Sequence, residues 1–159
     1  MYELYKINKN DILNYDDSKF NSNYSIEIVN RMKCNKLKDI LMYYYWFIIT
    51  KGGFKMYIVK HKDQIIHYSY LISKCYKFPF MSKYDFEIGP CFTNENYRGQ
   101  GIYPSVLKRI LTDAVDNTNN TFMIIDDSNI SSINGVKKLG FLKINNLKKD
   151  KFKRYVITR

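Results

Sequence analysis

A glycine-containing loop with the residue types of an anion-binding site runs from Asn96 to Pro104. Gly99 and Gly101 allow the backbone to turn tightly, with its amides directed inward. Where such a loop opens a helix, the N–H groups of the first turn lack partners, and the positive end of the helix dipole adds to their attraction for anions. The segment therefore predicts phosphate binding, and a pyrophosphate is its natural ligand. An isolated Arg-Gly-x-Gly sequence is more often an ordinary connection, so a second signal is needed.

The strands that must position this loop follow from the alternation of apolar residues. Alternation predicts a hairpin with its turn at residues 61–63, and a ladder interrupted at Gly89 and Pro90, since proline cannot donate to a ladder. The predicted strands are residues 2–7, 54–60, 64–72, 84–93, 121–125, 142–145 and 152–158. Residues 8–23 are expected to form a loop with a short helix.

Three helices are expected from apolar residues at three- and four-residue steps. The first starts near Cys34, ends at residues 52–53 and buries one face. The second has Pro104 in its first turn, and the third covers about residues 131–139 and stops at Gly140. The expected apolar faces are Leu37, Ile40, Leu41, Tyr44 and Phe47 in the first helix, and Val106, Leu107, Ile110, Leu111 and Ala114 in the second. This order of elements implies an α/β (α+β) fold, in which helices pack on the faces of a mixed sheet.

The composition fits one globular domain over residues 1–159, with 45% hydrophobic and 26% charged residues. The net charge of +11 attracts anions, but the lysines are scattered, so we assign the charge to a solvated surface and cofactor steering rather than to nucleic acid. Cys34, Cys75 and Cys91 build neither a disulfide framework nor a metal site, which favours a reducing cytoplasm. The longest apolar run, residues 40–49, is about half of a bilayer span, so we expect no membrane insertion.

The loop and a second segment together resemble the GNAT superfamily of N-acetyltransferases. The family's motif A, Arg/Gln-x-x-Gly-x-Gly/Ala, is met by Arg98 and Gly101 and imperfectly by Tyr103. About thirty residues downstream the family carries an Asn, a small residue three positions later and a closing Gly-Phe. The matching residues here are Asn129, Ser132, Gly140 and Phe141. The resemblance covers residues 85 to about 141 and leaves the N-terminal third unassigned.

This resemblance implies a GNAT-like central sheet, mixed but mostly antiparallel, whose two parallel strands splay apart around the pantetheine arm of acetyl-CoA. Backbone groups of Phe92 and Thr93 would hold that arm from one side, and Asn129 would reach it from the other. The pyrophosphate would be bound by the backbone amides of Arg98, Gly99, Gln100, Gly101, Ile102 and Tyr103. No metal is implied.

Two departures from the family pattern bear on mechanism. Tyr103 replaces the usual small residue, and Pro104 removes one amide from the helix start. The tyrosine that often serves the family as general acid aligns with Val136, which has no proton to give. The leaving thiolate must therefore be protonated in another way.

Two residues are candidates for the base that deprotonates the attacking amine. Glu87 lies on the strand that resembles the family's fourth, and without a bulge it would share a face with Cys91 and Thr93. His67 alternates onto one face with Ser69 in an apolar strand, and an unperturbed imidazole titrates near neutral pH. For each, a structural role is an equally serious alternative. A covalent mechanism through Cys91 is not favoured, because no group is placed by sequence to activate it.

The function predicted is N-acetyl transfer from acetyl-CoA to a primary amine of a small-molecule acceptor, by direct attack. An amino sugar, free or nucleotide-linked, is the favoured acceptor, because the aromatic and basic segment 76–84 should border the acceptor side. A homodimer is compatible with this prediction. The alternative is a non-catalytic acyl-CoA-binding or nucleic-acid-binding module on the same fold.

Overall fold

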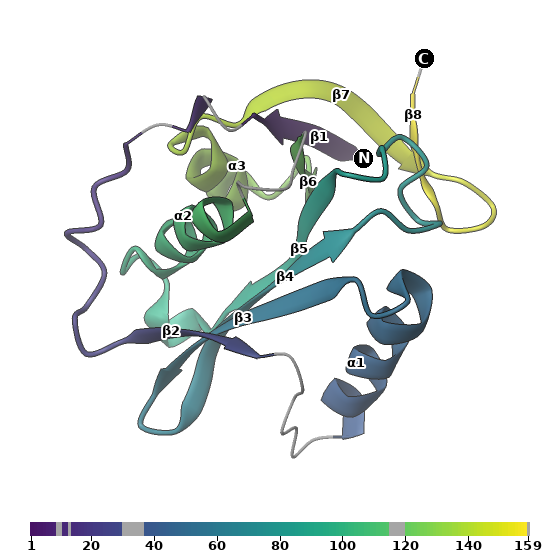
Figure 1. Ribbon diagram of the computed structural model, residues 1–159. Coiled ribbons are helices and arrows are strands. Elements are labelled where there is room, and N and C mark those ends of the chain that lie inside the picture. Colours follow the sequence, from purple (N-terminus) through teal and green to yellow (C-terminus); the bar gives the residue numbers. More distant parts are fainter. Residues whose placement is uncertain (9–10, 13, 30–36, 115–119, 159) are drawn as a thin grey trace.

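The computed structural model describes residues 1–8, 11–12, 14–29, 37–114 and 120–158. In this part of the chain, strands form a sheet with the order β2-β3-β4-β5-β6-β1-β7-β8 (Figure 1). Their bounds are β1 Tyr2–Ile7, β2 Ser25–Val29, β3 Phe54–His61, β4 Gln64–Ser73, β5 Phe86–Thr93, β6 Thr121–Asp126, β7 Leu142–Lys149 and β8 Tyr155–Ile157. Helix α1 is Leu37–Thr50, α2 is Ile102–Ala114, α3 is Ile130–Lys137, and a 3-10 turn, η2, is Glu95–Tyr97.

The sheet is antiparallel except at its centre, as the sequence predicted. Among the described strand pairs only β5 and β6 run parallel, and they pair over two positions, Phe86 with Thr121 and Glu87 with Phe122. Beyond Glu87 the two strands separate, which leaves one backbone edge of each without a ladder. This splay is the feature of the fold that creates the site.

Helices cover both faces of the sheet (Figure 1). Helices α2 and α3 lie on one face, where Val106, Leu107, Ile110 and Leu111 are buried, as predicted. Helix α1 lies on the opposite face, over a smaller core that includes Trp46, Tyr70 and Phe122. The two helical layers therefore enclose the splay from opposite sides.

The predicted buried face of the first helix is wrong. Leu41, Tyr44 and Phe47 are exposed at 61%, 57% and 49%, whereas Trp46 and Thr50, one helical turn apart, face the sheet. Almost every residue from 40 to 49 is apolar, so periodicity could not select the face that packs. The predicted start near Cys34 lies outside the described residues, and the end at Gly52, with a φ of 80°, is confirmed.

The remaining elements differ from the predictions mainly in their bounds. Strand β8 is shorter than the predicted run 152–158, and the 3-10 turn η2 was not predicted. The described part of residues 8–23 is loop with a 3-10 turn at Asp11, close to the expected loop with a short helix.

Strand β2 pairs with β3 at the sheet edge and was not predicted, because its five residues follow a polar stretch that was expected to be a loop. Strand β7 is longer than predicted and its hairpin to β8 turns at residues 150–154. Gly140 ends the turn after α3 with a φ of 97°, and Phe141 is buried against α3, as expected.

Candidate active site

A bulge in β5 determines which face each side chain of this strand meets. Opposite β5, Ser69 pairs with Cys91 and Leu71 pairs with Ile88, so Gly89 and Pro90 together face a single β4 residue. An extra residue reverses the alternation of faces. Cys91 therefore points to the α2 face and Glu87 to the α1 face. The expectation that Glu87 shares a face with Cys91 and Thr93 is wrong, because it holds only without the bulge.

Two cavities open on opposite faces of the splay. The larger has a volume of about 860 Å³ and lies on the α1 side, where Glu87 is one of its walls. The smaller has a volume of about 480 Å³ and lies at the start of α2, along the predicted phosphate loop. Four residues line both cavities: Cys91, Tyr103, Asn129 and Ser132. A molecule in one cavity can therefore meet a molecule in the other at the gap between β5 and β6.

The larger cavity is mainly apolar and aromatic. Its walls include Leu41, Met42, Tyr45 and Trp46 from α1, Phe78 from the segment after β4, and Tyr155 from β8. Lys77 adds a cation, with its Nζ 5.3 Å from the ring centre of Tyr45 and 5.2 Å from that of Trp46. Segment 76–84, which was predicted to border the acceptor side, thus borders this cavity through Lys77 and Phe78, whereas Tyr76 and Tyr84 are exposed.

The smaller cavity contains the predicted phosphate loop. Gly99 and Gly101 have φ values of 79° and 75°, which L side chains rarely adopt. From Gly99 to Tyr103, no backbone N–H donates to an acceptor within the described residues. The Arg98 amide differs from the prediction, because it already donates to the Glu95 carbonyl at 3.2 Å. The loop therefore offers five unpartnered amides to an anion.

The other predicted cofactor residues also lie at the smaller cavity or beside it. Phe92 and Thr93 line it, and the β6-facing edge of their strand has no ladder partner there. Asn129 caps α3, its Oδ1 accepting from the Ser132 amide at 3.1 Å. The Gln100 side chain turns away to the N-terminal segment, where the Tyr24 hydroxyl donates to its Oε1 at 2.9 Å. Gln100 is therefore not among the residues that line this cavity.

Sequence reasoning missed the part that residues 14–24 play in this cavity. Tyr15 and Lys19 line it, as does Lys138 at the end of α3. A Cβ atom at Gly101 would lie 3.1 Å from Lys19 Cβ and 3.3 Å from the Phe20 backbone nitrogen, so the glycine allows the segment to pass close to the loop. The sequence contained only a weak sign of this role, because Lys19 is one lysine in a polar stretch. Nothing in the local pattern indicated that it lies next to Gly101.

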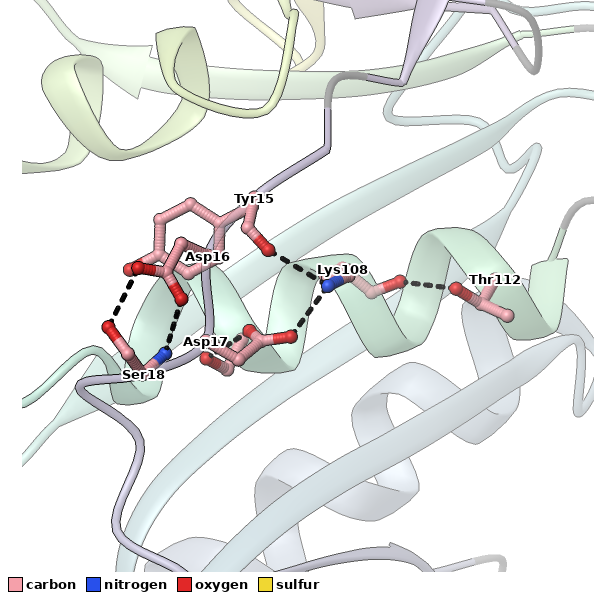
Figure 2. A network of polar contacts seen from close by, with 7 residues as sticks. Tyr15, Asp16, Asp17, Ser18, Lys108 and Thr112 are labelled. Carbon is pink, nitrogen blue, oxygen red and sulfur yellow. Dashed lines mark hydrogen bonds and ion pairs between the residues drawn. The ribbon is translucent and has the colours of Figure 1, made fainter.

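Hydrogen bonds hold this segment on α2 (Figure 2). The Asp17 carboxylate accepts from Ser105 Oγ at 2.8 Å and from Lys108 Nζ at 2.6 Å, and Lys108 Nζ also donates to the Tyr15 carbonyl at 2.9 Å. Asp16, next to it, accepts only from Ser18. Asp17 therefore anchors the loop segment that places Lys19 next to the predicted phosphate loop.

We expect Asp17→Ala to lower the free energy of unfolding by about 1 kcal/mol, since it removes a half-exposed ion pair and a hydrogen bond from the Ser105 hydroxyl. The affinity for coenzyme A should fall severalfold, because Lys19 is then less firmly held. Urea unfolding and calorimetric titration measure the two effects. Asp16→Ala is the matched control, and equal losses in both variants would contradict the anchoring role.

Burial controls the electrostatics of Glu87. The carboxyl is 4% exposed, and this burial raises its pKa to about 8, against the opposing attraction of Lys77 and a hydrogen bond from the Ile124 amide. A carboxylate poised near neutral pH in a cavity wall is suited to take a proton from an amine. This position makes Glu87 the better placed of the two predicted bases.

His67 lies in neither cavity wall. Its Nδ1 is 2.8 Å from Thr93 Oγ1 and its Nε2 is 2.9 Å from Ser69 Oγ, so both ring nitrogens have partners. Burial lowers its pKa to about 3, which keeps the ring neutral. These contacts favour a structural role, in which His67 bridges β4 and β5 next to the splay.

Cys91 stands at the junction of the cavities as a thiol. Burial raises its pKa to about 12, despite a hydrogen bond with Ser69, and the nearby Glu87 carboxylate adds to the rise. A thiol that stays protonated is a weak nucleophile. The environment of this thiol therefore gives no support to a covalent acyl-enzyme.

Among the described residues, no group of three or more His, Cys, Asp or Glu side chains could hold a metal. None of their helices is long and apolar enough to cross a membrane.

The similarity of this chain to known proteins lies in its three-dimensional structure, because no protein-family model and no curated protein matches the sequence. A GNAT acetyltransferase from Colwellia psychrerythraea superimposes with a TM-score of 0.64 over 89% of this chain, at 15% identity. A GNAT acetyltransferase from Elizabethkingia anophelis, solved with acetyl-CoA bound, superimposes with a TM-score of 0.61 at 19% identity, and the match covers 84% of each chain. A tandem GNAT protein from the clavulanic acid pathway gives a TM-score of 0.60 at 12% identity.

The chain has the GNAT fold. The predicted resemblance is thereby confirmed at the level of architecture: a mostly antiparallel sheet, one parallel pair and helices on both faces. The chain spans only about half of the Colwellia and tandem proteins, at 52% and 50% of their lengths. Identities below 20% in these matches carry the fold and not the substrates, so activity is argued from the site.

Proposed function

We propose that this protein transfers an acetyl group from acetyl-CoA to a primary amine of a small acceptor by direct attack. The observation that carries this proposal is the pair of cavities that meet at the splay. One has five unpartnered amides suited to a pyrophosphate, and the other has a buried carboxylate suited to an amine. A reaction between two substrates accounts for both cavities and for their meeting at the splay, whereas a simple binding site would need only one of them.

The residues of the smaller cavity support acetyl-CoA as its ligand. The amides from Gly99 to Tyr103 have no acceptor among the described residues and lie at the start of α2, and Lys19 and Lys138 add cations to the cavity wall. The open edge of β5 beyond Glu87 offers backbone groups to the amides of a pantetheine arm. An acetyl group at the end of that arm would reach the four residues common to both cavities.

The larger cavity fits the acceptor. Its aromatic side chains, Tyr45, Trp46, Phe78 and Tyr155, offer flat apolar faces, and Lys77 offers a cation. Aromatic faces pack against the apolar faces of sugar rings, and a lysine can pair with a phosphate. We therefore keep an amino sugar, free or nucleotide-linked, as the proposed acceptor. An arylalkylamine without an anionic group is the competing acceptor for the same walls.

The chemistry needs a neutral amine and a place for its proton. Glu87 takes a proton from the attacking amine, directly or through one water, as the nitrogen bonds to the acetyl carbon and the bond from that carbon to sulfur breaks. The amide product then leaves from the larger cavity and the free thiol of coenzyme A from the smaller.

The experiment that tests this function follows the release of free thiol from acetyl-CoA. Release should require an added amine, and a panel of glucosamine, glucosamine phosphates and arylalkylamines such as tyramine should identify the acceptor class. Coenzyme A should raise the melting temperature in the absence of any amine. A thermal shift with coenzyme A but no thiol release with any amine would favour a non-catalytic binding module. Salt-sensitive binding of DNA or RNA without any shift by coenzyme A would favour a nucleic-acid-binding module.

A further inference from the structure

Tyr103 stands on the wall that the two cavities share. Its ring is one of the four residues lining both, and it packs against the α2-side core. Its hydroxyl shares a hydrogen bond with the Ser132 side chain from α3. The ring centre is 6.2 Å from that of His67, on the same face. A phenol is therefore fixed from two helices at the point where a thioester and an amine would meet.

Gly135 in α3 makes room for this ring. A Cβ atom at position 135 would lie 2.9 Å from Tyr103 Cε1 and 3.0 Å from Cδ1, closer than real side chains approach. Glycine inside a helix destabilises it relative to alanine, so its presence in α3 needs a reason. The contact with Tyr103 supplies one. The small residue expected at position 103 has been replaced by a large one, and the space has been provided by the facing helix.

Protons for a leaving group are scarce at this junction. Of the four shared residues, Asn129 has no acidic proton, and the Cys91 thiol already shares a hydrogen bond with Ser69. Val136, on the helix where the family often carries a tyrosine, is fully buried in the core and has no proton to give. Tyr103 and Ser132 are the two hydroxyl groups left on the shared wall.

We propose that Tyr103 donates the proton that the coenzyme A thiolate takes as it leaves, and that Ser132 positions the Tyr103 hydroxyl. This inference rests on the proposed acetyl transfer. As the new carbon–nitrogen bond forms, Glu87 accepts the amine proton. As the carbon–sulfur bond breaks, the sulfur receives the phenolic proton. A proton from Glu87 then restores the tyrosine, so both residues return to their starting states and no other reactant is consumed.

The hydrogen bond with Ser132 is the part of the environment of Tyr103 that helps proton donation, because it lowers the pKa of the phenol. Burial acts the other way and raises that pKa well above the usual value for tyrosine, with Cys91 and Glu87 adding to the rise. The hydroxyl therefore keeps its proton at rest, and its position on the shared wall, rather than its acidity, supports the assignment. The same electrostatic influence of Glu87 favours return of the proton to a tyrosinate.

The test compares leaving groups. With acetyl-CoA and the best amine of the panel, Tyr103→Phe should lower kcat about 10- to 100-fold, with the calorimetric Kd of coenzyme A changed less than twofold. The second acyl donor is S-acetyl-4-nitrothiophenol, whose far more acidic thiol leaves without a proton. With this donor Tyr103→Phe should lose less than threefold in kcat/KM relative to the unsubstituted protein. Tyr44→Phe, on the exposed face of α1, is the matched control and should change neither donor's rate.

Two further variants keep the proposal testable if the first is unstable. Ser132→Ala should lower kcat severalfold with acetyl-CoA and spare the nitrothiophenyl donor. Gly135→Ala should reproduce the selective loss by displacing the ring. Equal losses with both donors would show that the ring only shapes the cavity and would overturn proton donation, as would a loss below threefold with acetyl-CoA. Absence of amine-dependent turnover by the unsubstituted protein would overturn the proposed function, and this inference with it.

Discussion

Replacing Glu87 by Gln should lower kcat/KM for acetyl transfer by about 10²- to 10⁴-fold, the range ascribed to general base catalysis, and leave the Kd of acetyl-CoA nearly unchanged. Gln keeps the size of the side chain and can still accept the Ile124 amide, but it cannot take a proton. Steady-state rates and calorimetric titration separate the two effects. His67→Gln is the comparison variant, and a larger loss there than in Glu87→Gln would give the base role to His67.

The pH dependence gives this prediction a second readout. Because the raised pKa of Glu87 is about 8, kcat/KM of the unsubstituted protein should rise as pH passes through 8. The loss in Glu87→Gln should be largest up to that pH. It should shrink above it, because more of the acceptor amine is then neutral without help. A loss below about tenfold over the whole range would place proton transfer elsewhere and would contradict the assignment of the catalytic face.

Stability should report the same carboxyl without any substrate. The folded-state pKa of Glu87, about 8, lies above the ordinary value of 4.5, so the fold favours the protonated form. Its contribution is complete below about pH 4.5 and is lost as pH rises through 8, by up to ~1.4 kcal/mol per pH unit. The unsubstituted protein should therefore lose stability between pH 5 and pH 8 relative to Glu87→Gln. Urea unfolding at pH 5 and at pH 8 measures this. If the difference in unfolding free energy between the two proteins is the same at both pH values, the carboxyl is not buried in solution.

A negative charge in the phosphate loop should weaken coenzyme A binding about 30- to 150-fold. Gly99→Asp adds a carboxylate beside the amides proposed to bind the phosphate, and Coulomb repulsion between two unit charges about 5.5 to 8 Å apart near a protein surface costs roughly 2 to 3 kcal/mol. Position 99 is the cleaner site for this test, because nothing lies within 4 Å of a Cβ atom there. Glu at Gly101 would abolish binding too, but it would also displace Lys19, so its effect would mix packing with charge.

Gly99→Asn is the matched control for the charge. Asn and Asp tolerate the positive φ of 79° at this position about equally, and they have the same shape. Any loss common to both variants reports the backbone, and the difference between them reports the phosphate. That difference should shrink as salt is raised, because exposed charges are then screened. Equal Kd values for the two variants at low salt would contradict the assignment of phosphate binding to this loop.

The extent of correct prediction differs from element to element for physical reasons. The hairpin of β3 and β4, the strand β6 and the helix α2 were predicted well, because each combines clear periodicity with a residue that ends or starts it. Helix α1 was found but its buried face was not, since a helix apolar on nearly all sides carries no moment that favours one face. Strand β2 was missed because its five residues follow a polar stretch that was expected to be a loop, and only its pairing with β3 identifies it as a strand.

The amino-acid sequence by itself determined the backbone turn of the predicted phosphate loop. Two glycines ahead of a helix, a second segment that starts at Asn129, and the strands between them are local features, and local features set backbone conformation directly. They were enough to predict the GNAT fold by resemblance, and the resemblance implied the splayed pair of strands. They also selected the loop that is proposed to bind the cofactor. The candidate base was also selected from the sequence, but for a wrong reason, because its face was counted without the bulge.

Only the tertiary structure decided how the two halves of the site meet. The bulge at Gly89 and Pro90 sends Glu87 to the α1 face and Cys91 to the α2 face, and its position in the ladder depends on pairing with a distant strand. The approach of Lys19 to Gly101, and of Tyr103 to Gly135, joins segments far apart in the chain. Such contacts leave no periodic trace in sequence, because they arise from packing between elements and not from the conformation of any one of them.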